Sequence, residues 1–358
     1  MSRFVQLHLL TAYPPSNPNR DDLGRPKTAL LGNVQRMRIS SQAIKRAVRE
    51  ADGFRAALAG QLGERTQRLG DLVERHLADR QFDESKRLDI ARQIAGVFGK
   101  LKNEKDKHPT HIEQLAFVSP EEKAFALDLA DRVAAGEELP KEKDLAKMAL
   151  RTADGAADIA MFGRMLAGSP EFNREAAVQV AHAITVNKVE VENDYYTAVD
   201  DLKVPSEDAG AGFIGEAGFA AGVFYLYVCV DRALLVENLG GDAELAARAL
   251  EVLIKTLASA SPSGKRNSFA NHVRAEYVLA ERGDSQPRSL ASAFVEPVSK
   301  GDQVALAVKK LTRQREAFAA VYGRDWDAEK IIHVGVDGSA TLDELAGFCT
   351  EDMPAPAQ

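Results

Sequence analysis

The spacing of hydrophobic residues changes twice along this chain of 358 residues. Residues 3–12 alternate between apolar and polar side chains, which is the period of a half-buried strand. Residues 54–167 are instead rich in Ala, Leu and charged residues at helical spacing, and strand-like runs return from residue 177. A helical block flanked by strand-forming segments predicts an α+β fold, in which a sheet receives a mainly helical insertion.

Local signals place the individual elements. Ser40 or Ser41 is a candidate N-cap, and the run SPEE at 119–122 has the pattern of a capping box. Asp158 stands where it could cap a helix beginning IAMF. The remaining expectations are strands at 34–39, 110–119, 177–201, 220–230, 274–283 and 331–336, helices near 139–143, 242–259, 302–321 and 341–348, a long loop at 13–27, and a mobile glycine-rich tip at 204–222.

The most basic part of the chain surrounds the helix start at Ser40. The whole chain carries a net charge of −7, yet residues 20–49 hold eight basic residues against two acidic ones. That segment therefore carries +6 and the rest of the chain −13. A basic segment in an acidic protein is typical of polyanion binding, and the alternative is a solvated face balanced by acids elsewhere. The eight are Arg20, Arg25, Lys27, Arg36, Arg38, Lys45, Arg46 and Arg49.

The start of this helix is a candidate phosphate site. Free N–H groups and the positive end of the helix dipole favour an anion there. Gln42, Lys45 and Arg49 fall on one ridge above Ser40, so together they could contact successive phosphates without reading a base. Arg20 and Lys27, on the proline-rich loop, could close over the same backbone. A capped amphipathic helix with ordinary surface cations explains the helix alone equally well.

Three further groups of residues are candidates for nucleic-acid contact. Lys265 and Arg266 lie in a serine-flanked loop, and Tyr195 and Tyr196 precede the glycine-rich segment, where aromatics could stack on unpaired bases or pack on a sheet instead. The third group is interleaved with acids, which locally favours a solvated helix face. It consists of Lys141, Lys143 and Lys147.

No catalytic, metal or cofactor motif appears. The histidines are scattered, and Pro109 inside HPTH at 108–111 favours a loop over a metal-binding helix. The loop GKR at 264–266 lacks the glycine spacing of a phosphate-binding loop. We therefore expect no enzyme activity, metal or cofactor. Two cysteines, no run of about 18 apolar residues and no signal-like start predict a cytoplasmic protein without a membrane span.

Four runs resemble one family in collinear order. They are NRDDLGRPKTALLGNVQRMRISSQAIKRAVR at 19–49, FGRML at 162–166, VAHAITVNKVEVENDYYTAVDDL at 180–202 and GKRNSFA at 264–270. In these runs the chain resembles the CasC (Cse-type, Cas-seven family) backbone subunit of the type I-E CRISPR Cascade complex. The resemblance spans most of the sequence.

The resemblance implies a fold like a right hand. An RRM-like (ferredoxin-like) palm would comprise residues 1–53 and 168–358, with a thumb hairpin at about 194–222, and residues 54–167 would form helical fingers. It also implies a non-catalytic subunit that assembles head to tail along CRISPR RNA in an antiviral ribonucleoprotein. The implied partners are that RNA, target DNA through the guide, further copies of the chain and other Cascade subunits, with no membrane.

The family's RNA contacts match residues of this chain one by one. Met165 matches a methionine that wedges against bases, and Tyr195, Tyr196 and Thr197 match thumb residues at a displaced base, where the family often has Trp-Phe at the first two. The lysines at 141, 143 and 147 fall near a group used on target DNA, at a different spacing. The family's contacts to the RNA backbone match Arg20, Lys27, Ser40, Gln42, Lys45 and Arg49. The family commonly has a lysine in place of Arg49. From the basic segments we add four further RNA-binding candidates, Arg38, Arg46, Lys265 and Arg266.

Two other functions remain open from the sequence. One is a metal-dependent ribonuclease like the type III backbone subunits, with Asp21 or Asp22 as its carboxylate. The other is an interaction scaffold that binds no nucleic acid.

Overall fold

A computed structural model describes residues 2–80, 82–166, 168–198 and 213–355, and it shows an α+β fold. Its centre is a mostly antiparallel sheet in the order β11-β10-β1-β9-β7-β3-β2, with β6 and β8 also paired to β9. The strands of this sheet are β1 (Phe4–Ser16), β2 (Thr28–Leu31), β3 (Val34–Ile39), β6 (Val178–Val180), β7 (Ala183–Thr185), β8 (Glu192–Ala198), β9 (Phe213–Asp231), β10 (Tyr277–Gly283) and β11 (Ala328–His333).

One face of the sheet packs on the main hydrophobic core. Val5, Leu7 and Leu9 point into it from β1, because alternate residues of a strand face the same side. Helices bury their apolar stripes against them, as Ile44 and Val48 of α1 do. The covering helices are α1 (Ser41–Glu50), α2 (Asp52–Ala57), α7 (Ala157–Phe162), α8 (Arg232–Asn238), α9 (Ala243–Ser259) and α12 (Leu342–Thr350).

The opposite face carries α11 (Gln303–Tyr322) and a buried polar network. His8 contacts the Tyr225 hydroxyl at 2.8 Å and Glu281 at 3.2 Å, and Arg288 and Arg315 each bind Glu281 at 2.6 Å. Burial lowers the pKa of His8. Burial alone would raise the pKa of Glu281, but hydrogen bonds from His8 and Arg288 hold that pKa well below its usual range. The sheet therefore keeps a satisfied charge cluster under α11.

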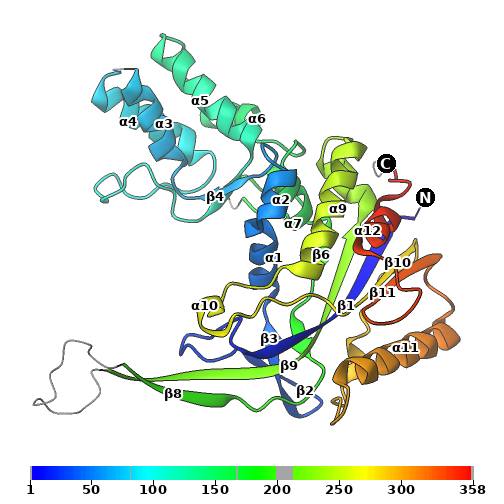
Figure 1. The fold of residues 1–358 in the computed structure, drawn as a ribbon. Coiled ribbons are helices and arrows are strands. Elements are labelled where there is room, and N and C mark those ends of the chain that lie inside the picture. Colours follow the sequence, from blue (N-terminus) through cyan, green and yellow to red (C-terminus); the bar gives the residue numbers. More distant parts are fainter. Residues whose placement is uncertain (1, 81, 167, 199–212, 356–358) are drawn as a thin grey trace, which may run out of the picture.

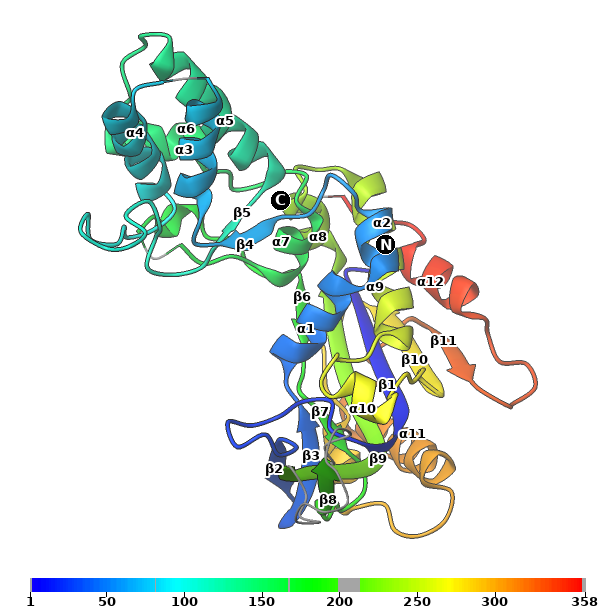
Figure 2. The same ribbon diagram turned by 60° about the vertical axis from the view of Figure 1, so that its left-hand side comes forward.

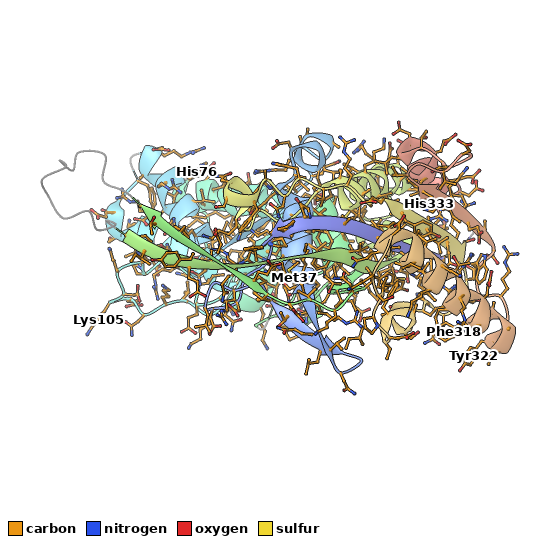
Figure 3. The ribbon with its side chains drawn as sticks, turned by 60° about the horizontal axis from the view of Figure 1, so that its bottom comes forward. Met37, His76, Lys105, Phe318, Tyr322 and His333 are labelled. Atoms are coloured by element: carbon orange, nitrogen blue, oxygen red, sulfur yellow. The ribbon has the colours of Figure 1, made fainter. Side chains whose placement is uncertain are left out.

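The β8–β9 hairpin projects from the body, at the opposite end of the molecule from α11, whose Phe318 and Tyr322 are labelled in Figure 3 (Figures 1 and 3). β8 pairs with the first part of β9, from Glu192↔Phe219 to Ala198↔Phe213. Of the glycine-rich tip predicted at 204–222, residues 204–212 lie outside the described part of the chain. Residues 213–222 belong to β9 rather than to a loop.

A helical unit (residues 64–150) stands apart from the sheet, as Figures 1 and 2 show. It contains β4 (Glu64–Thr66), α3 (Leu69–Asp79), α4 (Glu84–Gly96), β5 (Ala116–Val118), α5 (Pro120–Ala134) and α6 (Glu142–Ala149). Its own core includes Val73, Ile94 and Leu129. At the ends of the expected insertion, Phe54 and Met161 pack in the main core instead. The junction helices α2 and α7 thus belong to the sheet's core, because their apolar sides face it.

Two of the predicted caps, Ser40 and the box at Ser119, are confirmed. Ser40 caps α1, the capping box at Ser119 starts α5, and Thr341 forms a second box at α12. Several expectations were wrong, among them the single strand at 177–201, whose described part divides into β6, β7 and β8. β1 continues to Ser16 where a loop was expected, because a register shift after Tyr13 accommodates the two prolines without ending the pairing with β9. The strand β2 was not expected, and of residues 110–119 only Ala116–Val118 form a strand. Among the described helices, none is long and apolar enough to cross a membrane.

Candidate nucleic-acid interface

The start of α1 is tied to two neighbouring segments. The Ser40 Oγ accepts the Ala43 N–H at 3.3 Å, and the Ser40 N–H donates to Asn19 at 2.8 Å. The Ser41 N–H donates to the His182 Nδ1 at 3.3 Å. The expectation of free N–H groups at this end is therefore wrong in part, because the cap and His182 occupy two of them. Ser40 itself is buried and serves as the cap.

The ridge of Gln42, Lys45 and Arg49 lies on α1, between the helical unit and the β8–β9 hairpin (Figures 1 and 2). Gln42 is exposed. The Lys45 ammonium lies 5.5 Å from the centre of the Phe162 ring, and burial, followed by repulsion from Arg65, lowers the pKa of Lys45. The ridge thus presents one polar amide and one partly desolvated cation.

Arg49 is held by its own protein. Its Nε donates to Asp158 at 2.8 Å, its Nη2 donates to the Gly63 carbonyl, and its guanidinium lies 4.5 Å from the Phe117 ring centre. Asp158 also accepts the Gly63 N–H at 2.7 Å, so it ties the residue before β4 to α7 and does not cap a helix as expected. Burial raises the pKa of Asp158 although Arg49 opposes that rise. Arg49 therefore has a charge partner that the sequence did not reveal.

The basic segment divides into core, paired and unpaired cations. Arg36 is fully buried and donates to backbone carbonyls, among them Thr185 and Phe294, so it is a structural residue. Arg46 pairs with Glu50 at 2.7 Å on the surface. Within the described part of the chain, the other five cations have no carboxylate oxygen within 4.0 Å. These five are Arg20, Arg25, Lys27, Arg38 (bound to His182 at 3.1 Å) and Lys45.

Arg20, Arg46 and Arg266 meet at another place, a cavity of about 790 Å³ beside α1. Its walls are the loop that follows β1, one side of α1 and the loop before the short helix α10 (Arg266–Phe269). Gly264 packs so tightly that a Cβ there would lie 2.3 Å from the Pro18 carbonyl oxygen. Four carboxylates share the lining with these arginines, which makes it a poor phosphate channel. They belong to Asp21, Asp22, Glu50 and Asp52.

Neither acidic residue of the ribonuclease hypothesis stands in a metal cluster. The Asp21 carboxylate accepts the Leu23 and Arg25 N–H groups, so it shapes the loop. Asp22 is exposed. Across residues 2–80, 82–166, 168–198 and 213–355, no three metal-binding side chains come together.

Met165 follows α7 with 78% of its surface exposed, and it lines a second cavity with Phe162. Sequence reasoning missed two residues of this cavity, Arg65 and Leu115. Arg65 pairs across the β4–β5 ladder with Phe117, and nothing in the local sequence announces that pairing. The ridge and Met165 are thus brought together at the junction with the helical unit.

The aromatic pair lies on the projecting hairpin. Tyr195 and Tyr196 are adjacent on β8, so they point to opposite faces, and they are 65% and 43% exposed. The Tyr196 ring covers Gly215, where an added Cβ would lie 2.4 Å from it. Exposed Thr197 is paired with Ile214. The alternative that these tyrosines pack on a sheet therefore holds only for Tyr196, whose ring lies over Gly215 of the paired strand.

The two remaining lysine groups lie apart from the ridge. Lys265 adopts a left-handed backbone (φ 48°) just before α10. Lys141, Lys143 and Lys147 are exposed on α6 and the residue before it, in the helical unit. The structure therefore does not bring them together with the ridge, although Gly264 and Arg266, on either side of Lys265, line the cavity beside α1.

Comparison with known proteins gives a consistent result. A family model described as "CT1975-like protein" matches residues 5–348. A chain of a solved "CRISPR RNA-guided surveillance complex, pre-nicking" superposes with a TM-score of 0.84 at 30% identity, covering 97% of this chain and 99% of that one. A chain of a second "CRISPR RNA-guided surveillance complex" gives a TM-score of 0.62 at 26% identity, covering 97% and 98%. No curated protein matches the sequence.

Proposed function

We propose that this chain, which belongs to the CT1975-like protein family, is a backbone subunit of a CRISPR surveillance complex. In that complex the chain itself would bind the guide RNA. In finer detail, we propose a non-catalytic subunit of a type I-E Cascade complex, with the sheet as an RRM-like palm. Copies would assemble head to tail along the RNA beside other Cascade subunits. The bound guide would then present its bases to target DNA.

The observation that carries this proposal is the ridge on α1. Lys45 is half-buried and has no carboxylate oxygen within 4.0 Å among the described residues, although burial of an unpaired cation is unfavourable. An arriving phosphate would remove that cost. Gln42 and Lys45 are one helical turn apart, so both can contact one strand's backbone. Backbone contacts of this kind hold RNA without selecting its sequence.

Exposed apolar side chains complete the proposed RNA path. Met165 lies beside the ridge, and the Tyr195 and Tyr196 rings lie on the hairpin. The tyrosine rings can stack on bases of any identity, so they suit a guide whose sequence varies. We propose that the hairpin covers the RNA and displaces a base with these tyrosines and Thr197. The exposed lysines of α6 would contact target DNA.

A salt series with one variant tests the ridge. Lys45→Ala should weaken binding of single-stranded RNA and make the salt dependence shallower, by about 0.7 in the slope of log affinity against log salt, since one phosphate contact is lost. The loss should be equal for unrelated RNA sequences. Lys86→Ala, which removes an exposed lysine of α4, is the matched control. Unchanged binding in Lys45→Ala would count against the proposal.

A cleavage assay separates this function from a ribonuclease. The assembled protein would be incubated with RNA complementary to its guide and with magnesium. We expect the RNA to remain intact. Cleavage at regular spacing, abolished by Asp21→Asn or Asp22→Asn, would favour the enzyme instead.

A further inference from the structure

Arg49 completes the ridge on α1, but its positive charge is already paired within the protein. It lies one helical turn beyond Lys45, on the same side of the helix. An RNA strand held at Lys45 would therefore pass within reach of the Arg49 side chain, which is 24% exposed. The Asp158 side chain that pairs with it is only 1% exposed. A phosphate at this end of the ridge would have to compete with Asp158 for Arg49.

The pairing of Arg49 with Asp158 leaves part of the guanidinium unused. It forms where α1, α7 and the segment before β4 meet, at the junction with the helical unit (Figure 2). One carboxylate oxygen accepts the Arg49 Nε–H at 2.8 Å, and the other accepts the Gly63 N–H at 2.7 Å. A phosphate can instead accept two parallel N–H groups of one guanidinium, which is a stronger arrangement than a single charged hydrogen bond. A phosphate can therefore displace the carboxylate from Arg49.

Charged groups on the neighbouring elements do not replace Arg49 beside Asp158. Within the described residues, no other cationic nitrogen lies within 4.0 Å of the Asp158 carboxylate. β6 carries no charge, and α8 faces α7 with the uncharged Asn238, which donates to a backbone carbonyl. The nearby cations contact other side chains instead, namely Lys45 of α1, Arg65 of β4 and Arg248 of α9.

Loss of Arg49 would leave a buried carboxylate without a cation. Such a group avoids the cost of its buried charge by taking up a proton. Burial already raises the pKa of Asp158, and Arg49 opposes that rise. Without Arg49 the pKa would rise further. The neutral carboxyl group can still accept the Gly63 N–H through its carbonyl oxygen, so the segment before β4 would stay attached to α7.

We propose that Asp158 is a positioning residue for RNA binding, which holds Arg49 in the absence of RNA and accepts one proton from solvent when an RNA phosphate binds Arg49 in its place. The inference rests on the proposed function, because Arg49 is the third side chain of the same ridge. One hydrogen bond of Arg49 is exchanged for another, and the proton neutralises the carboxylate left behind. The complex then holds one proton more than the protein alone, so RNA affinity must rise as the pH falls.

The test measures binding of a short uridine oligomer to the full chain at pH 6.0 and pH 8.0, each over a salt series. Uridine has no group that titrates in this range. The unmodified protein should bind more tightly at pH 6.0. The slope of log affinity against log salt should also be steeper there by about 0.7, because Arg49 adds one phosphate contact.

Two variants remove the competition between Asp158 and phosphate. Asp158→Asn keeps the shape of the side chain and frees Arg49, so it should bind about tenfold more tightly at pH 8.0 and show the steep slope at both pH values. Adding Arg49→Gln to Asp158→Asn removes the cation as well and should give the shallow slope at both. Asp52→Asn, at an exposed aspartate in the first turn of α2, removes the same charge and is the matched control.

A second titratable group near the ridge needs its own control. His182 accepts the Ser41 N–H at the start of α1, and histidines commonly titrate in this pH range. His182→Gln should therefore keep the full pH dependence of the unmodified protein. If the dependence disappears in His182→Gln and persists in Asp158→Asn, Asp158 is not its source and the inference is refuted.

The remaining outcomes separate this inference from the function on which it rests. If Asp158→Asn binds less tightly than Asp52→Asn, Arg49 binds RNA while paired with Asp158, and the exchange is refuted. If Lys45→Ala weakens binding while Asp158→Asn behaves like Asp52→Asn, the exchange is also refuted and the proposed function stands. If the unmodified protein binds no oligomer at low salt at either pH, both proposals fail.

Discussion

Removing the Glu122 carboxylate should unfold the helical unit selectively. Glu122 is fully buried at the third position of α5. Its oxygens accept the N–H groups of Ser119 and Arg151 at 2.9 Å each, and they bind Arg164 at 2.6 and 2.7 Å. Glu122→Ala would leave the buried Arg164 guanidinium without a counter-charge and would break the capping box.

The magnitude follows from these two losses. Breaking a buried ion pair by deleting one partner costs about 3–5 kcal/mol. Losing half of the capping box adds about 1 kcal/mol. We therefore expect the free energy of unfolding to fall by about 4–6 kcal/mol, a large share of the roughly 5–15 kcal/mol that stabilises a typical domain. The loss should fall on the core around Val73, Ile94 and Leu129.

Hydrogen exchange combined with urea unfolding measures this prediction. Amides of α3, α4 and α5 should lose protection in Glu122→Ala, while amides of β1 and β9 keep theirs. Glu121→Ala removes the neighbouring exposed carboxylate and should change stability by about 0.5 kcal/mol or less. A loss below about 1 kcal/mol in Glu122→Ala, or an equal loss of protection in β1, would refute the reasoning.

Three further changes probe the sheet and the α1 region. Burial lowers the pKa of His8, so the unfolded chain binds more protons than the folded one as the pH falls through about 6.5. The urea concentration at the unfolding midpoint should therefore be lower at pH 5.5 than at pH 7.5. The difference should be smaller in His8→Gln. Arg36→Met leaves buried carbonyls without donors and should cost about 3 kcal/mol or more in urea unfolding. Gly264→Ala meets a backbone oxygen and should cost about 1–3 kcal/mol, whereas Gly53→Ala, in open space on a helix, should gain about 0.5–1 kcal/mol.

Each of these predictions has a contrary result. An unchanged midpoint between pH 7.5 and pH 5.5 would mean that His8 is not held neutral. If Arg36→Met is as stable as the unmodified chain, the carbonyls it serves find other donors. Equal stabilities of Gly264→Ala and Gly53→Ala would show that the loop carrying Gly264 is not packed against its neighbour.

The sequence revealed those structural features that depend on residues close together along the chain. The cap at Ser40, the box at Ser119 and the strand at β1 follow from local patterns, and the structure has them, although β1 is buried on both faces and not on one. Contacts between distant segments were hidden. Arg36 looks like surface charge until β7 and the segment around Phe294 enclose it.

The candidate site divides along the same line. The ridge of Gln42 and Lys45 follows from helical spacing alone. Asp158 is 109 residues from the Arg49 it binds, so a charge count cannot reveal that pairing. Arg65 and Leu115 reach the cavity only because β4 and β5 pair. Such contacts depend on tertiary packing, which a single sequence does not display.

Binding of two unrelated single-stranded RNAs of equal length, measured across a salt series with the purified full chain, tests the central claim most directly. We predict equal affinities for the two sequences and a steep loss of affinity as salt rises, because the ridge holds phosphates and reads no base. Absence of binding at low salt would contradict the account, and so would strong preference for one sequence.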